Sequence, residues 1–290
     1  SSNLELSERS YQNHKQSTEY ADTPFSLSGV GARHGDLSRF PQDVGNFLVT
    51  FLCPERGVVL DPFGGHNSRM ELVWRLRRDY IGFDISHTFM EANNKIRSML
   101  YEENERNLLD KNEAKISLIE NDSRNILDYV DKNSVDFCLS SPPFYDLEWY
   151  GDEPEQLGRS KTYNDFLYSL GKIVENCYQA LKPGCYIAWE FNDFRREGVF
   201  YPYHIDGMTL FKRVGFMLHD VLIIDYGSSF FESFLSDVEH NKVMPKRHSY
   251  IVIARKYKVS REPKREQTRE RLLDEVKEFD DDKAKQAGMF

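Results

Sequence analysis

Short apolar runs alternate along the chain with longer helix-like segments. The runs fall at residues 58–60, 80–85, 116–119, 135–139, 185–188, 221–224 and 247–255. Short continuous runs of this kind are typical of strands buried in a parallel sheet. Helix-like stretches lie between several of them, from about residue 68 to 77 and from 203 to 214. The alternation predicts an α/β domain.

A glycine-containing loop follows the first run. Residues 61–65 read Asp-Pro-Phe-Gly-Gly, directly after a β-branched strand and before a helix. A glycine turn at such a point lets a ligand approach the backbone closely. The spacing differs from the Gly-x-Gly-x-x-Gly fingerprint of dinucleotide sites. Ser68 is placed to cap the helix or to bind a ligand carboxylate.

The run at 135–139 leads into Ser-Ser-Pro-Pro-Phe at residues 140–144. Two consecutive prolines hold the backbone extended and lack N–H groups, so the carbonyl groups there are available as acceptors. Ser141 adds a hydroxyl, and Phe144 offers a flat apolar face. These features fit a planar base with an amino group. The alternative interpretation is a strand that ends in an X-Pro-Pro turn with a core phenylalanine.

Two further strands end in acidic residues. Asp84 closes the run at 80–85, and Asp122 follows the run at 116–119. Each acid alone would also suit a loop position or a helix N-cap. The order of four polar features at four strand ends is what gives the pattern its weight.

In this order the motifs resemble the S-adenosylmethionine-dependent DNA amino-methyltransferases, which modify cytosine N4 or adenine N6. That family's cofactor loop reads Asp-Pro-Phe-x-Gly-x-Gly-Thr, so Gly65 matches the first glycine while Asn67 and Ser68 depart from the pattern. Its catalytic motif is Asp, Asn or Ser before Pro-Pro-aromatic, and the Ser form is associated mainly with cytosine N4. The resemblance covers about residues 30–257. It implies a Rossmann-like methyltransferase fold with a mostly parallel seven-stranded sheet flanked by helices.

The resemblance also implies site residues. The expected catalytic residues are Ser141, Pro142, Pro143 and Phe144. The expected cofactor-binding residues are His34, Phe40, Pro41, Asp61, Pro62, Phe63, Gly65, Ser68, Asp84, Ile85, Asp122 and Ser123. Among them Asp61 and Gly65 would hold the methionine part, Asp84 the ribose and Asp122 the adenine. The expected chemistry is direct methyl transfer to the amino group of a flipped base, with no metal. An equally good interpretation of His34 is a hydrogen-bonded polar residue at the end of a secondary-structure element, with no role in the site.

The charge pattern bears on the partner. The formal net charge of −9 argues against simple DNA binding, because phosphate contacts supply much of the affinity for nucleic acid. However, residues 242–271 contain eleven Lys or Arg against three acids. This stripe, including Lys246 and Arg247, could face a phosphate backbone, or it could be a solvated helix face. Trp149 and Tyr150 follow the catalytic motif and are predicted to cover the flipped base.

Other features exclude neighbouring classes. The four cysteines lack metal spacing and are expected to be reduced core thiols. No Pro-Cys dipeptide follows a strand, which excludes the nucleophilic thiol of cytosine C5 methylation. No run is apolar enough to span a membrane and no secretory signal is visible, so we expect a cytoplasmic protein.

The predicted domain organisation is a flexible lead-in (1–24), a catalytic domain (25–257) and a charged helical extension (258–290). Little sequence follows the catalytic part, so target recognition is expected from short loops, a specificity subunit, a second copy or a missing domain. The expected function is a site-specific DNA methyltransferase, as in restriction-modification, acting on cytosine N4. Two alternatives stay open: an adenine N6 or RNA methyltransferase, and a catalytically silent scaffold that binds nucleic acid or a partner.

Overall fold

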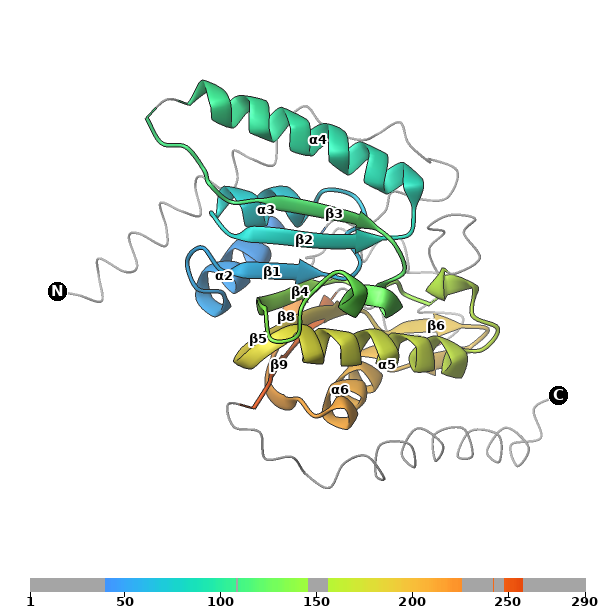
Figure 1. Ribbon diagram of the computed structural model, residues 1–290. Helices are drawn as coiled ribbons and strands as arrows, with labels where there is room; N and C mark the ends of the chain where they lie inside the picture. Colours follow the sequence, from blue (N-terminus) through green and yellow to red (C-terminus); the bar gives the residue numbers. More distant parts are fainter. Residues whose placement is uncertain (1–39, 108, 146–155, 226–241, 243–247, 258–290) are drawn as a thin grey trace.

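The computed structural model describes residues 40–107, 109–145, 156–225, 242 and 248–257 (Figure 1). The predicted lead-in and C-terminal extension lie outside these residues, as do His34, Trp149, Tyr150, Lys246 and Arg247. Predictions about them stay predictions.

A seven-stranded sheet forms the centre of the molecule, in the order β3-β2-β1-β4-β5-β9-β8. The first five strands in this order run parallel, and β9 is antiparallel to both of its neighbours. This topology confirms the prediction of a Rossmann-like, mostly parallel α/β fold. The strands are β1 (Val58–Asp61), β2 (Asp79–Asp84), β3 (Ile116–Glu120), β4 (Val135–Ser140), β5 (Leu181–Phe191), β8 (Met217–Asp225) and β9 (His248–Arg255).

Helices cover both faces of the sheet, as Figure 1 shows. One apolar core lies between one face of the sheet and the helices α5 and α6. A second core lies between the other face and the helices α2 and α3. All six residues of β4 are buried, because this central strand is covered on both faces. The helices are α2 (Gln42–Leu52), α3 (Met70–Arg75), α4 (His87–Arg106), α5 (Tyr163–Ala180) and α6 (Tyr203–Val214), with short 3₁₀ helices η2 (Ser123–Asp128) and η3 (Leu157–Arg159).

Several element boundaries differ from the sequence prediction. The helix expected from residue 68 is α3, which begins at Met70, and its N-cap position is Arg69. The prediction that Ser68 caps this helix is therefore wrong. Strand β8 begins at Met217 rather than near residue 221. The structure also contains a small hairpin of β6 (Phe194–Arg196) and β7 (Val199–Tyr201), which the sequence pattern did not predict.

The carboxyl ends of β1, β2, β3 and β4 lie along one edge of the sheet, because these strands are parallel neighbours. Open α/β sheets bind ligands outside this edge, where the strand order reverses. Here the reversal lies between β1 and β4. In the described part of the chain, no helix is long and apolar enough to cross a membrane.

Candidate functional site

A cavity opens at the carboxyl ends of the parallel strands. Its wall combines carboxylates, glycine-loop backbone and apolar side chains, and it reaches from the end of β2 to the segment after β4. The lining residues are Pro62, Phe63, Gly65, His66, Arg69, Asp84, Ile85, Phe89, Asp122, Ser123, Ser141, Pro143, Phe144, Gln156, Leu157 and Ile173. The cavity therefore joins parts of both predicted motifs.

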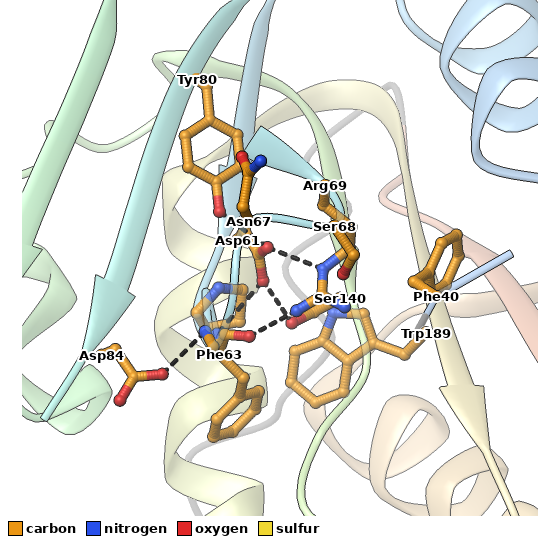
Figure 2. A network of polar contacts seen from close by, with 12 residues as sticks. Phe40, Asp61, Phe63, Asn67, Ser68, Arg69, Tyr80, Asp84, Ser140 and Trp189 are labelled. Carbon is orange, nitrogen blue, oxygen red and sulfur yellow. Dashed lines mark hydrogen bonds and ion pairs between the residues drawn. The ribbon is translucent and has the colours of Figure 1, made fainter. Parts of the chain in front are cut away.

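Asp61, the last residue of β1, is the centre of a buried polar network (Figure 2). Its carboxylate accepts hydrogen bonds from Arg69 Nε at 2.7 Å, Tyr80 OH at 2.8 Å and Ser140 Oγ at 2.6 Å. The Phe63 N–H also donates to it, at 3.2 Å. Asp61 is fully buried and does not line the cavity. It therefore ties the ends of β1 and β4 and the beginning of β2 to the loop that does.

The charges of this network shift the pKa values of Arg69 and Tyr80. Burial acts to lower the pKa of Arg69, but Asp61, Tyr80 and Glu190 together outweigh it, and the pKa of Arg69 is raised. Burial, and next the Asp61 charge, raise the pKa of Tyr80 well above its ordinary value. Tyr80 is therefore a neutral hydrogen-bond donor at physiological pH, and Arg69 is a cation held at the cavity wall.

The loop at residues 63–67 bends tightly around two glycines. Gly65 has φ 51°, a left-handed conformation that side chains disfavour. At Gly64 a Cβ atom would lie 3.3 Å from the Phe83 carbonyl oxygen, to which the Gly64 N–H donates. Asn93 of α4 holds the same loop, since its Nδ2 donates to the Gly65 carbonyl at 2.8 Å. The loop is therefore a well-anchored turn, although Asn67 and Ser68 depart from the pattern of the family that the sequence resembles.

Asp84, at the end of β2, fixes the loop from the other side. One carboxylate oxygen accepts the Gly65 N–H and the other accepts the Ser86 N–H, each at 2.8 Å. Both bonds orient the carboxylate at the cavity wall, and a carboxylate has room for further donors. Ile85 and Phe89 add an apolar patch beside it. Asp84 thus lines the cavity with its carboxylate fixed by two main-chain donors.

Asp122 and Ser123, after β3, also line the cavity. The Asp122 carboxylate caps η2 by accepting the Arg124 N–H at 2.8 Å, and it pairs with the Arg124 guanidinium. This N-cap role is the alternative that the sequence left open. The Ser123 hydroxyl donates to the Pro62 carbonyl, which joins the β3 end to the glycine loop.

The Ser-Pro-Pro-Phe segment leaves β4 and turns along the cavity. Ser141, Pro143 and Phe144 line it, and Pro142 does not. The Pro143 carbonyl accepts the Tyr203 hydroxyl at 3.1 Å, so one carbonyl of the segment is already engaged by the protein. Phe144 is only 8% exposed and also packs in the α5-side core. Phe144 is therefore both a core residue and part of the cavity wall.

Three other predicted cofactor residues in the described part of the chain, Phe40, Pro41 and Ser68, do not line the cavity. Phe40 is buried, and the Arg69 guanidinium carbon lies 5.5 Å from its ring centroid. Pro41 is the N-cap residue of α2. Ser68 contributes its carbonyl to Gln42 at 2.8 Å. Like Asp61, none of these three residues lines the cavity, and Phe40 packs against Arg69, which does.

Six lining residues were not predicted: His66, Arg69, Phe89, Gln156, Leu157 and Ile173. Phe89 was predictable, because it lies in the first turn of the helix that follows the Asp84 strand. Arg69 carried no sequence signal, since its ion pair with Asp61 depends on the turn of the loop between them. Within the described ranges, no three His, Cys, Asp or Glu side chains are grouped so as to hold a metal ion.

Comparison with known proteins gives structural likeness alone. No family model and no curated protein matches the sequence. A SAM-dependent methyltransferase from Methanosarcina mazei shares 13% identity at a TM-score of 0.48, over 76% of this chain and 99% of that chain. An rRNA methylase from Streptococcus thermophilus shares 11% at 0.46, over 77% and 99%. A candidate DNA modification methylase from Thermus thermophilus, complexed with S-adenosyl-L-methionine, shares 24% at 0.37, over 49% and 55%.

Proposed function

We propose that this chain is a methyltransferase that takes its methyl group from S-adenosylmethionine and modifies a nucleic-acid base. One observation carries the proposal. Asp84, Asp122 and Ser141, which follow three different parallel strands, line a single cavity together with the glycine loop. A cofactor and a planar amino-bearing substrate require such neighbouring subsites.

The lining fits the cofactor in its chemistry. Asp84 is oriented by two main-chain donors and supplies acceptors for a ribose diol. Ile85 and Phe89 offer apolar surface for an adenine ring, and Asp122 offers an acceptor for its amino group. Gly65 leaves backbone space for the methionine part. When bound, the cofactor supplies an electrophilic methyl group on a sulfonium.

In this proposal Asp61 acts through its neighbours, because its carboxylate is buried among four protein donors. It holds Arg69 at the cavity wall and keeps the glycine loop in place. Among the described lining residues, Arg69 is the one Lys or Arg, and a ligand carboxylate is the natural partner of such a group.

The base subsite is formed by the segment after β4. The flipped base stacks on Phe144, and its amino group donates to Ser141; the Pro142 carbonyl, expected from the sequence as a second acceptor, is not part of the cavity lining. These contacts hold the nitrogen lone pair toward the methyl group, and orientation of the two reactants lowers the barrier to displacement. The Pro143 carbonyl is unsuited to this role, because Tyr203 already donates to it.

Within this class we propose cytosine N4 of DNA as the substrate. Ser141 is neutral, and the Ser form of the motif is the feature that favours cytosine over adenine. Sequence recognition would come from short loops of this chain, a specificity subunit, a second copy or a further domain.

The decisive experiment is product analysis. The protein is incubated with methyl-labelled S-adenosylmethionine and, separately, duplex DNA, single-stranded DNA and RNA, and the digested nucleosides are separated by mass spectrometry. N4-methylcytosine from DNA is the expected product. N6-methyladenine would show that the substrate is adenine in DNA, and a labelled ribonucleoside would show that it is RNA. Either product would leave the proposed class, a nucleic-acid methyltransferase, unchanged. Absence of cofactor binding by calorimetry would overturn the proposal and favour a silent scaffold.

A further inference from the structure

The β6–β7 hairpin leaves the sheet directly after β5, the neighbour of β4. Its strands are joined by Glu197 and Gly198, with φ of 49° and 81°. Two consecutive residues with positive φ make the tight turn that matches the twist of a hairpin. A Cβ atom at Gly198 would meet nothing within 4 Å, so the turn projects into open space.

The inner side of the hairpin is fixed against Tyr145, the residue that follows the Ser-Pro-Pro-Phe segment. The Phe194 ring stacks on Tyr145, with centroids 6.4 Å apart, and on Tyr201, with centroids 4.9 Å apart. Tyr163, the first residue of α5, packs edge-on against Tyr201 at 4.8 Å. Figure 1 shows the hairpin beside α5. Aromatic packing thus holds the hairpin next to the base subsite.

Each face of the hairpin carries a cation: Arg195 shares one face with the exposed Phe200, and Arg196 lies on the face of Phe194, near Tyr145. Arg195 and Arg196 are exposed, and Phe200 is 48% exposed. The Arg195 guanidinium carbon lies 5.1 Å from the Phe200 ring centroid, and that of Arg196 lies 5.9 Å from the Tyr145 centroid. Glu197, in the turn, lies 3.8 Å from Arg196 and offsets part of its charge.

A second pair of cations flanks Ser160, a residue that Tyr145 contacts. Arg159, in η3, and Lys161, just after it, are exposed, and the Tyr145 hydroxyl donates to the Ser160 carbonyl at 3.5 Å. The same segment begins with Gln156 and Leu157, which line the cavity. The nearby acid Asp165 accepts a hydrogen bond from the Thr162 hydroxyl, and its N–H donates to the same hydroxyl.

We propose that these two segments form a nucleic-acid-binding surface, called the basic rim: Arg159, Lys161, Arg195, Arg196 and Phe200. The inference rests on the proposed function and names how that function holds its substrate. In a chain of net charge −9, the described parts of these two segments carry four exposed cations against two acids, Glu197 and Asp165, and both segments contact Tyr145, where the strand bearing a flipped base would pass. Arginine binds phosphate through paired N–H groups, and an exposed Phe can stack on an unpaired base.

The test measures binding of a fluorescein-labelled duplex of about two helical turns, and of the matching single strand, by anisotropy over a range of salt. The variant is Arg195→Gln with Arg196→Gln. The matched control is Arg106→Gln with Lys111→Gln, two exposed cations at the far end of α4 and before β3. We expect the rim variant to bind about tenfold more weakly at low salt, while the control matches the parent. The slope of log K against log salt concentration should become shallower by roughly two, because two phosphate contacts are lost. Phe200→Ala should weaken the single strand more than the duplex.

Cofactor binding and methyl transfer are measured on the same proteins. If the parent methylates nucleic acid and the rim variant binds it as tightly as the control, the basic rim is refuted and the proposed function stands. If the parent binds cofactor but neither binds nor methylates any nucleic acid, both are refuted. Equal losses in the rim and control variants would show a general charge effect and would also refute the rim.

Discussion

Arg69 and Asp61 form an ion pair with 2.7 Å between Nε and Oδ2, and both side chains are almost entirely buried. The pair connects the last residue of β1 to the residue before α3, across the glycine loop. Tyr80 and Ser140 donate to the same carboxylate from the flanking strands. One buried anion therefore sets the geometry of the loop, and the loop forms the cavity wall.

Asp61→Asn removes that anion at nearly constant volume. Breaking one side of a buried pair leaves an uncompensated charge, so the free energy of unfolding should fall by about 3–5 kcal/mol. Urea denaturation measures this change. Asp136→Asn is the matched control, since Asp136 pairs with the half-exposed Lys182 at the other end of the sheet. A loss at Asp61 no greater than at Asp136 would contradict the central role of the network.

Asp84→Ala should weaken S-adenosylmethionine binding at least tenfold. Hydrogen bonds to a charged group contribute about 1.5–3 kcal/mol, and the glycine loop also loses the acceptor of the Gly65 N–H. Calorimetry gives the affinity directly. Asp79→Ala, at the opposite end of the same strand, should leave it unchanged. Equal affinities of the Asp84 variant and the parent would remove Asp84 from the cofactor site.

Phe144→Ala should reduce turnover by a factor of about ten or more while cofactor affinity changes little. Stacking on a base is worth about 1–3 kcal/mol, whereas Asp84 and Asp122, the residues proposed to bind the cofactor, are unchanged in this variant. Phe144 is also a core residue, so Phe216→Ala, in the same core, controls for lost packing. Phe144→Tyr keeps the aromatic face and should retain turnover. If all three variants lose turnover alike, the effect is structural and Phe144 has no stacking role.

Much of the fold was predictable because buried parallel strands leave a strong local signal. The apolar runs ending at Asp61, Asp84 and Ser140 located three strands and the edge where they meet. The lining residues Gly65, Asp122 and Ser141 followed from motifs at those ends. Local sequence carries this information because parallel strands bring their carboxyl ends together.

The rest depended on tertiary contacts. The loop motif predicted a ligand-binding role for Asp61, but the turn of the loop places Arg69 against it and buries the carboxylate. The β6–β7 hairpin has three-residue strands, too short for a periodic pattern. Its position beside Tyr145 is set by aromatic packing between distant segments.

A pH dependence of stability should arise from Cys53, whose pKa burial raises from 9.0 to about 12. The folded thiol holds its proton more tightly than the unfolded one. Its stabilising contribution is therefore complete below pH 9 and is lost as the pH rises toward 12. Between those values the stability difference between the parent and Cys53→Ala should shrink by about 1.4 kcal/mol per pH unit. Urea denaturation from about pH 8 to about pH 10.5 measures it, and a constant difference would contradict the shift.

Tyr203→Phe tests whether the hydrogen bond to the Pro143 carbonyl positions the Ser-Pro-Pro-Phe segment. The Tyr203 hydroxyl donates to the Pro143 carbonyl, and its ring is fully buried, so removing the oxygen deletes one hydrogen bond at nearly constant packing. A hydrogen bond of this kind contributes about 0.5–1.5 kcal/mol, which corresponds to roughly a two- to twelvefold fall in kcat if it orients Ser141 and Phe144. Cofactor affinity should be unchanged, because Asp84 and the glycine loop lie elsewhere in the cavity. Tyr201→Phe, on the neighbouring hairpin, is the control and should keep the parent kcat. A Tyr203 variant with parental kcat and only a lower free energy of unfolding would show that the bond stabilises the fold without positioning the segment.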